Sequence, residues 1–346
     1  GPEVNHPKFK GEKCHDPAHV MTRVDTQQVH VGCNGGDTVA EFNRTESGLL
    51  KLNQFIKVSK DSDTAQAQPH AHWMGFDGKS MVTPNSNTSD STLFDFREYQ
   101  IVDKTFTGTL PIASGMMPDS SKYYVSNYLG DTISVMCGPY PKPAGSCTPG
   151  TRIKQLNLLD DNVDNSGYIS GGRYLDATTP AANLPGPAGG FSVQTPVSPD
   201  GKFVVIGNTL SGTITIIDTK YDTLVRSIPC DPGCHGVNFG AKKNGGYYAY
   251  VTSKFANRLI VLDYDPDNKG GAEDAKIVGS VLLVNDGAAI DDTVTGNRGM
   301  GGQGVMAVPN VYNGWVQQLP IGYKAQLTRA QRHPIGHLPG HDDDDE

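Results

Sequence analysis

The sequence predicts an all-β protein, a β-propeller of six to seven four-stranded blades. Five β-rich stretches share one order: a strand, then Asn or Ser, then a short polar turn, then an alternating strand. A second turn, such as "SPDGK", precedes several of them, and the strand openings recur with a base spacing of 43 residues. Four-stranded units that repeat every ~40–50 residues are typical of propeller blades. A β-sandwich, the alternative, would not repeat its turns at a fixed period.

Each of the five stretches reads as a β-hairpin, because turn residues separate two runs of β-forming residues. In chain order they are "HVGCNGGDTVAEFN" (30–43), "MVTPNSNTSDSTLFDF" (81–96), "YYVSNYLGDTISVM" (123–136), "VVIGNTLSGTITIID" (204–218) and "YAYVTSKFANRLIVLD" (248–263).

A short strand opening precedes each turn-and-hairpin unit, and we expect these openings on the innermost strands of the blades. They begin at His19, His72, Gly115, Ser192, His235 and Gly304.

The spacing of these openings also divides the chain. We expect the propeller to span 17–325, with insertions at about 137–190 and 264–300 where two spacings are long. Residues 1–16 form an N-terminal segment that is a candidate to close the last blade. Residues 326–346, rich in His and acids, are expected to be a solvated tail or a linker to a missing downstream domain.

The charge and hydropathy exclude two classes of partner. The chain of 346 residues has 29 basic and 37 acidic side chains, a net charge of −8. Nucleic-acid binding needs a basic surface, so we expect no nucleic-acid partner. No apolar run approaches the roughly 18–20 residues of a membrane-spanning helix, so no membrane span is expected.

Six cysteines suggest disulfides and export. Cys137 and Cys147 bracket a loop rich in Pro and Gly, "CGPYPKPAGSC", which has no metal-ligand spacing. A disulfide there implies an oxidising compartment, periplasmic or extracellular. Two further pairs are open to the same reading, Cys14 with Cys33 and Cys230 with Cys234.

Two of the quoted units resemble a known repeat. "YYVSNYLGDTISVM" and "SPDGKFVVIGNTLSGTITIID" are similar to YVTN-type repeats, which are found in exported seven-bladed β-propellers. The resemblance covers roughly residues 17–320. It implies an exported propeller, but it implies no single function, because the repeat occurs in scaffolds, surface proteins and redox enzymes.

Histidines recur at the strand openings. Innermost strands line the central channel of a propeller, so equivalent positions in different blades converge. His19, His72 and His235 are assigned to one repeat position, and His70 lies two residues before His72. Imidazole suits copper, zinc, iron and nickel. The pattern predicts a metal site of His19, His70, His72 and His235, with copper expected and zinc as the alternative. In the competing interpretation, each histidine only hydrogen-bonds a neighbouring blade.

A fainter resemblance links these histidines to the propeller domain of nitrous-oxide reductase, which holds a copper cluster with histidines near its axis. The resemblance implies copper at the channel mouth. This chain departs from that family because Gly115 and Ser192 stand where further histidines would be needed, and no cupredoxin motif is present. A complete multi-copper cluster is therefore not expected.

The stretch "CDPGCH" (230–235) has three interpretations: haem attachment, a metal site, or a disulfide beside a histidine. Haem attachment uses Cys-x-x-Cys-His, whereas three residues separate Cys230 from Cys234. We therefore expect no covalent haem. A disulfide that holds His235 at the channel mouth fits better.

Two functions remain from the sequence. The first is an exported propeller with a copper site and a redox or metal-handling role; if it is an enzyme, it is a copper-dependent oxidoreductase. The alternative is a non-catalytic scaffold that binds a protein or glycan partner. No acid–base constellation of a hydrolase or lyase is visible.

Overall fold

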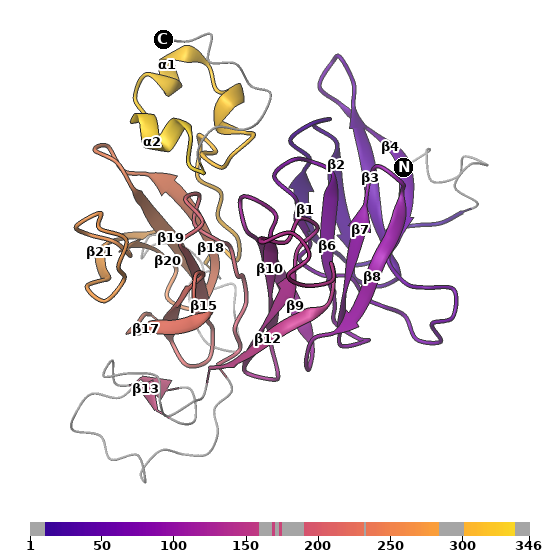
Figure 1. The fold of residues 1–346 in the computed structure, drawn as a ribbon, viewed down its shortest axis with the longest axis horizontal. Helices are drawn as coiled ribbons and strands as arrows, with labels where there is room; N and C mark the ends of the chain where they lie inside the picture. Colours follow the sequence, from indigo (N-terminus) through magenta and orange to yellow (C-terminus); the bar gives the residue numbers. More distant parts are fainter. Residues whose placement is uncertain are drawn as a thin grey trace.

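The computed structural model is an all-β propeller whose sheets follow one another along the chain (Figure 1). Within each sheet, every strand pairs antiparallel with the next strand in sequence, as alternating strands joined by tight turns do. The structure describes residues 11–158, 190–231, 233–283 and 301–335, and the backbone of two short strands, β13 (Tyr168–Ile169) and β14 (Arg173–Tyr174).

The first two blades are complete four-stranded sheets. Blade 1 is β1 (Pro17–Thr22), β2 (Val29–Cys33), β3 (Thr38–Arg44) and β4 (Leu50–Lys57), and blade 2 is β5 (Trp73–Met74), β6 (Ser80–Asn85), β7 (Asp90–Asp95) and β8 (Gln100–Phe106).

Blades 3 and 5 are also four-stranded, whereas blade 4 has three strands and only two isolated bridges, at Ser192 and Val197, on its inner edge. Blade 3 is β9 (Pro111–Met116), β10 (Lys122–Asn127), β11 (Thr132–Cys137) and β12 (Arg152–Asn157); blade 4 is β15 (Phe203–Asn208), β16 (Thr213–Asp218) and β17 (Thr223–Pro229); blade 5 is β18 (Cys234–Ala241), β19 (Tyr247–Ser253), β20 (Arg258–Asp263) and β21 (Lys276–Leu282).

A buried asparagine explains the Asn-turn pattern of the repeat. Asn208, the last residue of β15, donates from Nδ2 to the hydroxyls of Thr213 at 3.0 Å and Thr215 at 2.8 Å, across the turn. Asn127 likewise bonds two hydroxyls in blade 3, and Asn85 bonds the Asp90 carboxylate and a hydroxyl, that of Thr92, in blade 2. The amide therefore fixes the register of the hairpin, because both acceptors lie on the next strand.

Neighbouring blades touch along their inner strands. Ala71 donates its backbone N–H to the carbonyl of Ile112, at 2.9 Å, which joins blade 2 to blade 3. Gly115 on β9 lies where an added Cβ would collide with the backbone carbonyl of Thr195 in blade 4. The absence of a side chain at this position is what allows the two blades to approach.

The C-terminal segment 301–335 runs from blade 5 to blade 1. Tyr312 lies between several blades: its hydroxyl donates to the carbonyl of Val197 at 2.7 Å, and its ring stacks on Phe76 with centroids 5.0 Å apart. Gln318 donates to the carbonyl of Val24, at 2.9 Å, in blade 1. Two short helices follow, α1 (Ile321–Lys324) and α2 (Arg329–Arg332).

Several predicted boundaries differ from the structure. The described ranges contain five blades, fewer than the six to seven expected, and Gly304 opens no strand. The expected insertions contain regular structure, since β12 and β21 are the outer strands of blades 3 and 5.

The expected C-terminal tail begins with residues that pack on blade 5, because Gln331 on α2 is buried and donates to the carbonyl of Lys242 at 2.8 Å. Residues 1–10, 284–300 and 336–346 lie outside the described ranges.

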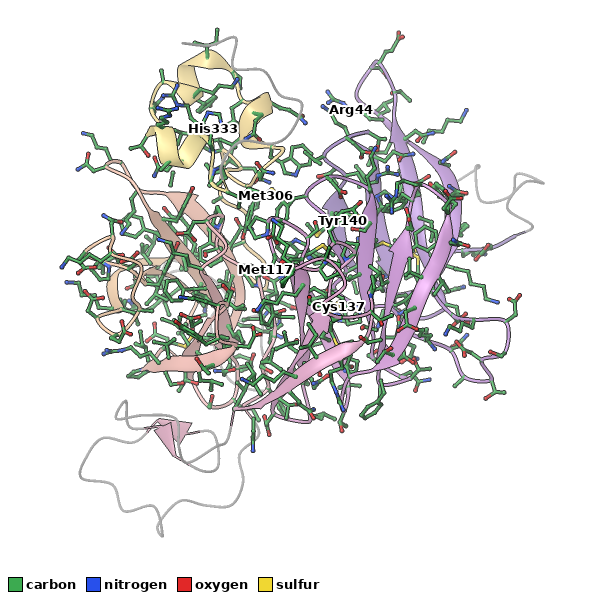
Figure 2. All side chains as sticks on the ribbon, in the orientation of Figure 1. Arg44, Met117, Cys137, Tyr140, Met306 and His333 are labelled. Carbon is green, nitrogen blue, oxygen red and sulfur yellow. A yellow bond between two sulfur atoms is a disulfide. The ribbon has the colours of Figure 1, made fainter. Side chains whose placement is uncertain are left out.

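The predicted disulfide between Cys137 and Cys147 is confirmed, and the two further pairs that the sequence leaves open are also bonded. Cys14 is bonded to Cys33 and Cys137 to Cys147, and Cys137 lies at the end of β11 (Figure 2). Three disulfides indicate an oxidising, extracytoplasmic environment. Within the described part of the chain, no helix has the length and apolarity to cross a membrane.

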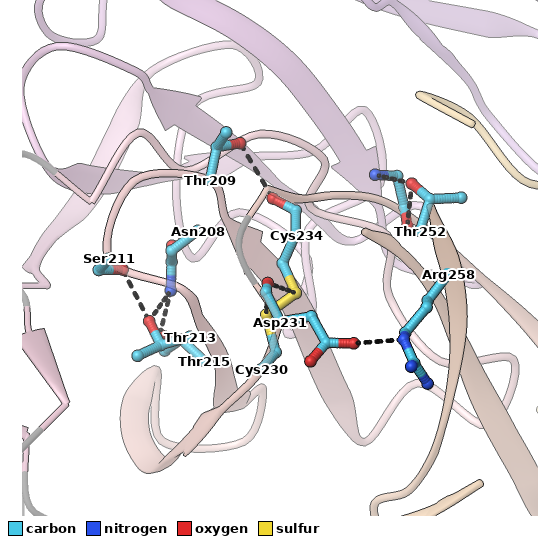
Figure 3. The surroundings of a disulfide bond; sticks show 11 residues. Asn208, Thr209, Ser211, Thr213, Thr215, Cys230, Asp231, Cys234, Thr252 and Arg258 are labelled. Atoms are coloured by element: carbon cyan, nitrogen blue, oxygen red, sulfur yellow. Dashed lines mark hydrogen bonds and ion pairs between the residues drawn. A yellow bond between two sulfur atoms is a disulfide. The ribbon is translucent and has the colours of Figure 1, made fainter. Parts of the chain in front are cut away.

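The third disulfide joins Cys230 to Cys234 at the start of β18 (Figure 3). Thr209 donates its hydroxyl to the carbonyl of Cys234 at 2.9 Å, which ties the bridge to blade 4. The bridge therefore fixes the residue directly before His235.

Candidate functional site

His70 and His235 are the structurally equivalent pair among the predicted ligands. His70 directly follows Pro69, which pairs with the last residue of β6. In the same way, His235 directly follows Cys234, which pairs with the last residue of β19. Each also makes the same interaction: Nδ1 of His70 contacts the carbonyl of Ile112 at 2.8 Å, and Nδ1 of His235 contacts that of Gln303 at 2.7 Å. The contact of His70 reaches the neighbouring blade, as the competing interpretation expects, whereas that of His235 reaches the C-terminal segment.

These carbonyl bonds fix the tautomer of both rings. A carbonyl only accepts, so Nδ1 of His70 and of His235 bears the proton and Nε2 keeps its lone pair. Burial lowers the pKa of both imidazoles. A neutral imidazole with Nδ1–H held by a carbonyl is the state in which protein histidines bind metals through Nε2.

His19 and His72 do not share the repeat position of His235. His72 stands three residues after Pro69, and His19 two residues after the equivalent Pro17, so the single repeat position assigned from sequence is wrong. The β-bulge in β1 does not cause this difference, because the same bulge recurs in β18 between Cys234 and Val237. The histidines stand at different positions in the sequence of each strand opening.

The rings of His19 and His72 lie edge to face, with centroids 5.3 Å apart. His72 is fully buried, and neither of its ring nitrogens has a hydrogen-bond partner among the described residues; the same holds for Nδ1 of His19. Burial lowers the pKa of His19 to about 4, with a smaller contribution from His70, and holds the pKa of His72 well below its ordinary value, with a smaller contribution from His19. Both imidazoles are therefore neutral at physiological pH.

A buried carboxylate lies in the same seam between blades 1 and 2. Glu41 on β3 accepts from Nε2 of His30 at 3.0 Å, from the Tyr99 hydroxyl at 2.6 Å, and from the side-chain amides of Asn53 and Gln54. Burial alone would raise the pKa of Glu41, but these four hydrogen bonds more than offset it and lower the pKa to about 2. His30 keeps a second buried nitrogen, Nδ1, without a partner among the described residues.

His30 and Glu41 are not among the residues that the sequence pattern indicates as functional. Their signal is a pair of polar residues within otherwise apolar strands, at positions that face each other across β2 and β3. Such a pair is visible in the sequence only once the hairpin register is known, because the residues are eleven positions apart.

Four buried ring nitrogens without partners thus gather on His19, His30 and His72. Buried polar groups are almost always satisfied, so this seam is where a bound species would be expected. In the described residues, no three His, Cys, Asp or Glu side chains are arranged to hold a metal ion together. The geometry provides a close pair of imidazoles, with His70 near enough to influence the titration of both His19 and His235.

Comparisons with known proteins agree on the fold. No protein-family model and no curated protein matches the sequence. Among solved structures, hydrazine synthase of Kuenenia stuttgartiensis superposes with a TM-score of 0.52 at 13% identity, covering 79% of this chain and 68% of that chain. Virginiamycin B lyase of Staphylococcus aureus gives 0.53 at 10%, covering 80% and 73%. The periplasmic gluconolactonase of Pseudomonas aeruginosa gives 0.51 at 14%, covering 77% and 70%.

These similarities assign the chain to the class of β-propellers. At 10–14% identity they show the shared fold, and a propeller serves many chemistries.

Proposed function

We propose that the chain is a periplasmic or extracellular β-propeller that binds a transition metal ion, copper in preference to zinc, in a metal-handling or redox role. His19 and His72 are the central ligands. His70 and His235 offer neutral Nε2 atoms nearby.

One observation supports this proposal above the others: His72 is fully buried, neither ring nitrogen has a partner among the described residues, and the ring lies against His19. A buried imidazole without hydrogen bonds costs free energy, which a bound ion would offset. Two imidazoles that bind one ion through nitrogens about 2 Å from it have ring centres roughly 5–6 Å apart. The 5.3 Å between these two centroids falls in that range.

Copper is preferred because imidazole sites follow an affinity order that peaks at copper. Rigid inner strands position the two rings before any ion arrives, so little ordering of the protein is needed on binding.

The test is metal binding by the purified chain. Wild-type protein is incubated with Cu(II) or Zn(II), freed of loose metal on a desalting column, and analysed for metal per chain. We expect about one copper per chain, lost in His19→Ala and in His72→Ala and retained in His15→Ala, whose exposed ring lies outside the seam. Circular dichroism checks the fold of each variant, and the partly exposed His19 gives a variant with little loss of packing. If the wild type retains neither metal at micromolar concentration, the alternative of a non-catalytic scaffold is favoured.

A further inference from the structure

Two strand openings share the pattern His-x-Met. In blade 1 it is His19-Val20-Met21 on β1, and in blade 2 it is His72-Trp73-Met74 at the entry to β5. The middle residues face elsewhere: Val20 is 57% exposed, and Trp73 packs with a different core cluster from Met74. We call these two tripeptides the His-x-Met arms.

The arms meet in the seam between blades 1 and 2. The two rings, of His19 and His72, lie 5.3 Å apart. Met74 is buried in the apolar cluster between the blades, which includes Phe96, and Met21 packs against the same cluster. The two imidazoles are therefore in contact, and both methionines pack in one apolar cluster.

The two methionines add the donors that the imidazoles lack. No three His, Cys, Asp or Glu side chains in the described ranges can hold a metal ion together, so a site in this seam needs donors of another type. The thioether sulfur of methionine is a soft ligand that selects Cu(I), whereas imidazole accepts Cu(I), Cu(II) and Zn(II) alike.

We propose that Met21 and Met74 complete a two-nitrogen, two-sulfur site with His19 and His72, and that the site is selective for Cu(I). This inference rests on the proposed function, because it uses the same two imidazoles. It adds the oxidation state of the ion and two ligands that the histidine pattern does not include.

Blade 3 provides an internal comparison. Met116 on β9 pairs with Tyr123 as Met74 pairs with Met81, so Met116 is the counterpart of Met74 in the next blade. Two residues before it stands Ser114 in place of an imidazole. A buried methionine without a histidine partner is thus available as a matched control.

The experiment measures Cu(I) affinity of the full chain under anaerobic conditions, by competition with a chromophoric Cu(I) chelator, and Zn(II) affinity by an equivalent competition. The variants are Met21→Leu with Met74→Leu together, and Met116→Leu as the control. Leucine keeps the volume and apolar character of methionine, so the fold is retained. X-ray absorption at the copper edge of the loaded protein reports whether sulfur is bound.

We expect the double variant to lose at least tenfold in Cu(I) affinity and to lose the sulfur signal, while Zn(II) affinity changes less than threefold and Met116→Leu behaves as wild type. If wild-type protein binds copper or zinc through its histidines but the double variant keeps full Cu(I) affinity, or the wild-type spectrum shows no sulfur, this inference is overturned and the proposed function stands. If wild-type protein binds no metal at all, both fail.

Discussion

Glu41 shows how one side chain can be both buried and charged. Its carboxylate has no exposed surface, but it accepts hydrogen bonds from four side chains. These bonds stabilise the ionised form inside the seam. An ionised buried group is costly unless its hydrogen bonds are complete. The network therefore ties β2, β3 and β4 of blade 1 to Tyr99 of blade 2.

The pKa of Glu41 makes this contribution dependent on pH. The folded-state pKa of about 2 lies below the ordinary value of 4.5, so the stabilisation is complete above pH 4.5 and is lost as pH falls toward 2. We expect Glu41→Gln to lower the free energy of unfolding at pH 7 by on the order of 3 kcal/mol.

Urea denaturation between pH 2 and pH 7 tests this expectation, and the wild type and Glu41→Gln should converge at the acid end. Glu46→Gln, at an exposed position, should show no such difference. A constant gap between wild type and Glu41→Gln across the range would contradict the assignment.

The candidate histidines can be identified from the sequence, but their grouping in space cannot. Histidine at the strand openings was enough to bring His19, His70, His72 and His235 to attention. The grouping was not predictable, because the position of each histidine within its blade depends on which residue pairs with the second strand. The sequence does not show this strand register.

Among the strands and turns, the hairpin with its buried asparagine was the most predictable. The Asn-turn-Thr pattern has a local cause, since Asn208 bonds two hydroxyls five and seven residues ahead. The inner edge of blade 4 was less predictable, because only isolated bridges at Ser192 and Val197 replace a continuous strand there.

Removal of this amide should cost stability. In Asn208→Ala two buried hydrogen bonds, to the hydroxyls of Thr213 and Thr215, are lost, so we expect the free energy of unfolding to fall by about 2 kcal/mol, roughly 1 kcal/mol for each bond. Thermal denaturation followed by circular dichroism measures the change. Asn244→Ala, on an exposed turn, serves as the control and should be neutral; an equal loss in both variants would argue against the hairpin role.

The disulfide between Cys137 and Cys147 spans ten positions of sequence and closes a loop at the end of β11. Closing a loop of that length stabilises the fold by roughly 2–3 kcal/mol through the unfolded chain. We expect Cys137→Ala with Cys147→Ala to unfold at correspondingly lower urea. Peptide mass spectrometry without reduction should recover the two cysteines of the wild type in one linked fragment, and free thiols at both would refute the pairing.

The arrangement of the blades depends on backbone contacts between distant segments. The sequence indicated a propeller because its turns repeat, but it could not give the number of blades. The outer strands β12 and β21 lie in stretches that interrupt the repeat, and the segment after residue 301 packs between blades without forming a strand at Gly304. Such packing depends on tertiary contacts that do not recur at a fixed spacing in the sequence, so the repeat does not predict them.

Substitution of Gly115 tests the contact between blades 3 and 4. An added methyl group would collide with the carbonyl of Thr195, which is backbone and cannot turn aside. We expect Gly115→Ala to destabilise the whole propeller by roughly 2–3 kcal/mol, as overpacked positions do. Gly304→Ala is the matched control, because nothing lies within 4 Å of its added methyl group; equal denaturation midpoints for the two variants would contradict this view of the blade contact.

The C-terminal segment also has a consequence for the order in which the protein is made. Tyr312 and Gln318, which follow blade 5 in the sequence, bond to Val197 in blade 4 and to Val24 in blade 1. Because a ribosome makes the chain from its N-terminus, blades 1 and 4 are synthesised before these two partners. A chain that crosses a membrane during export would therefore complete the packing of blades 1 and 4 only after residue 318 has been translocated.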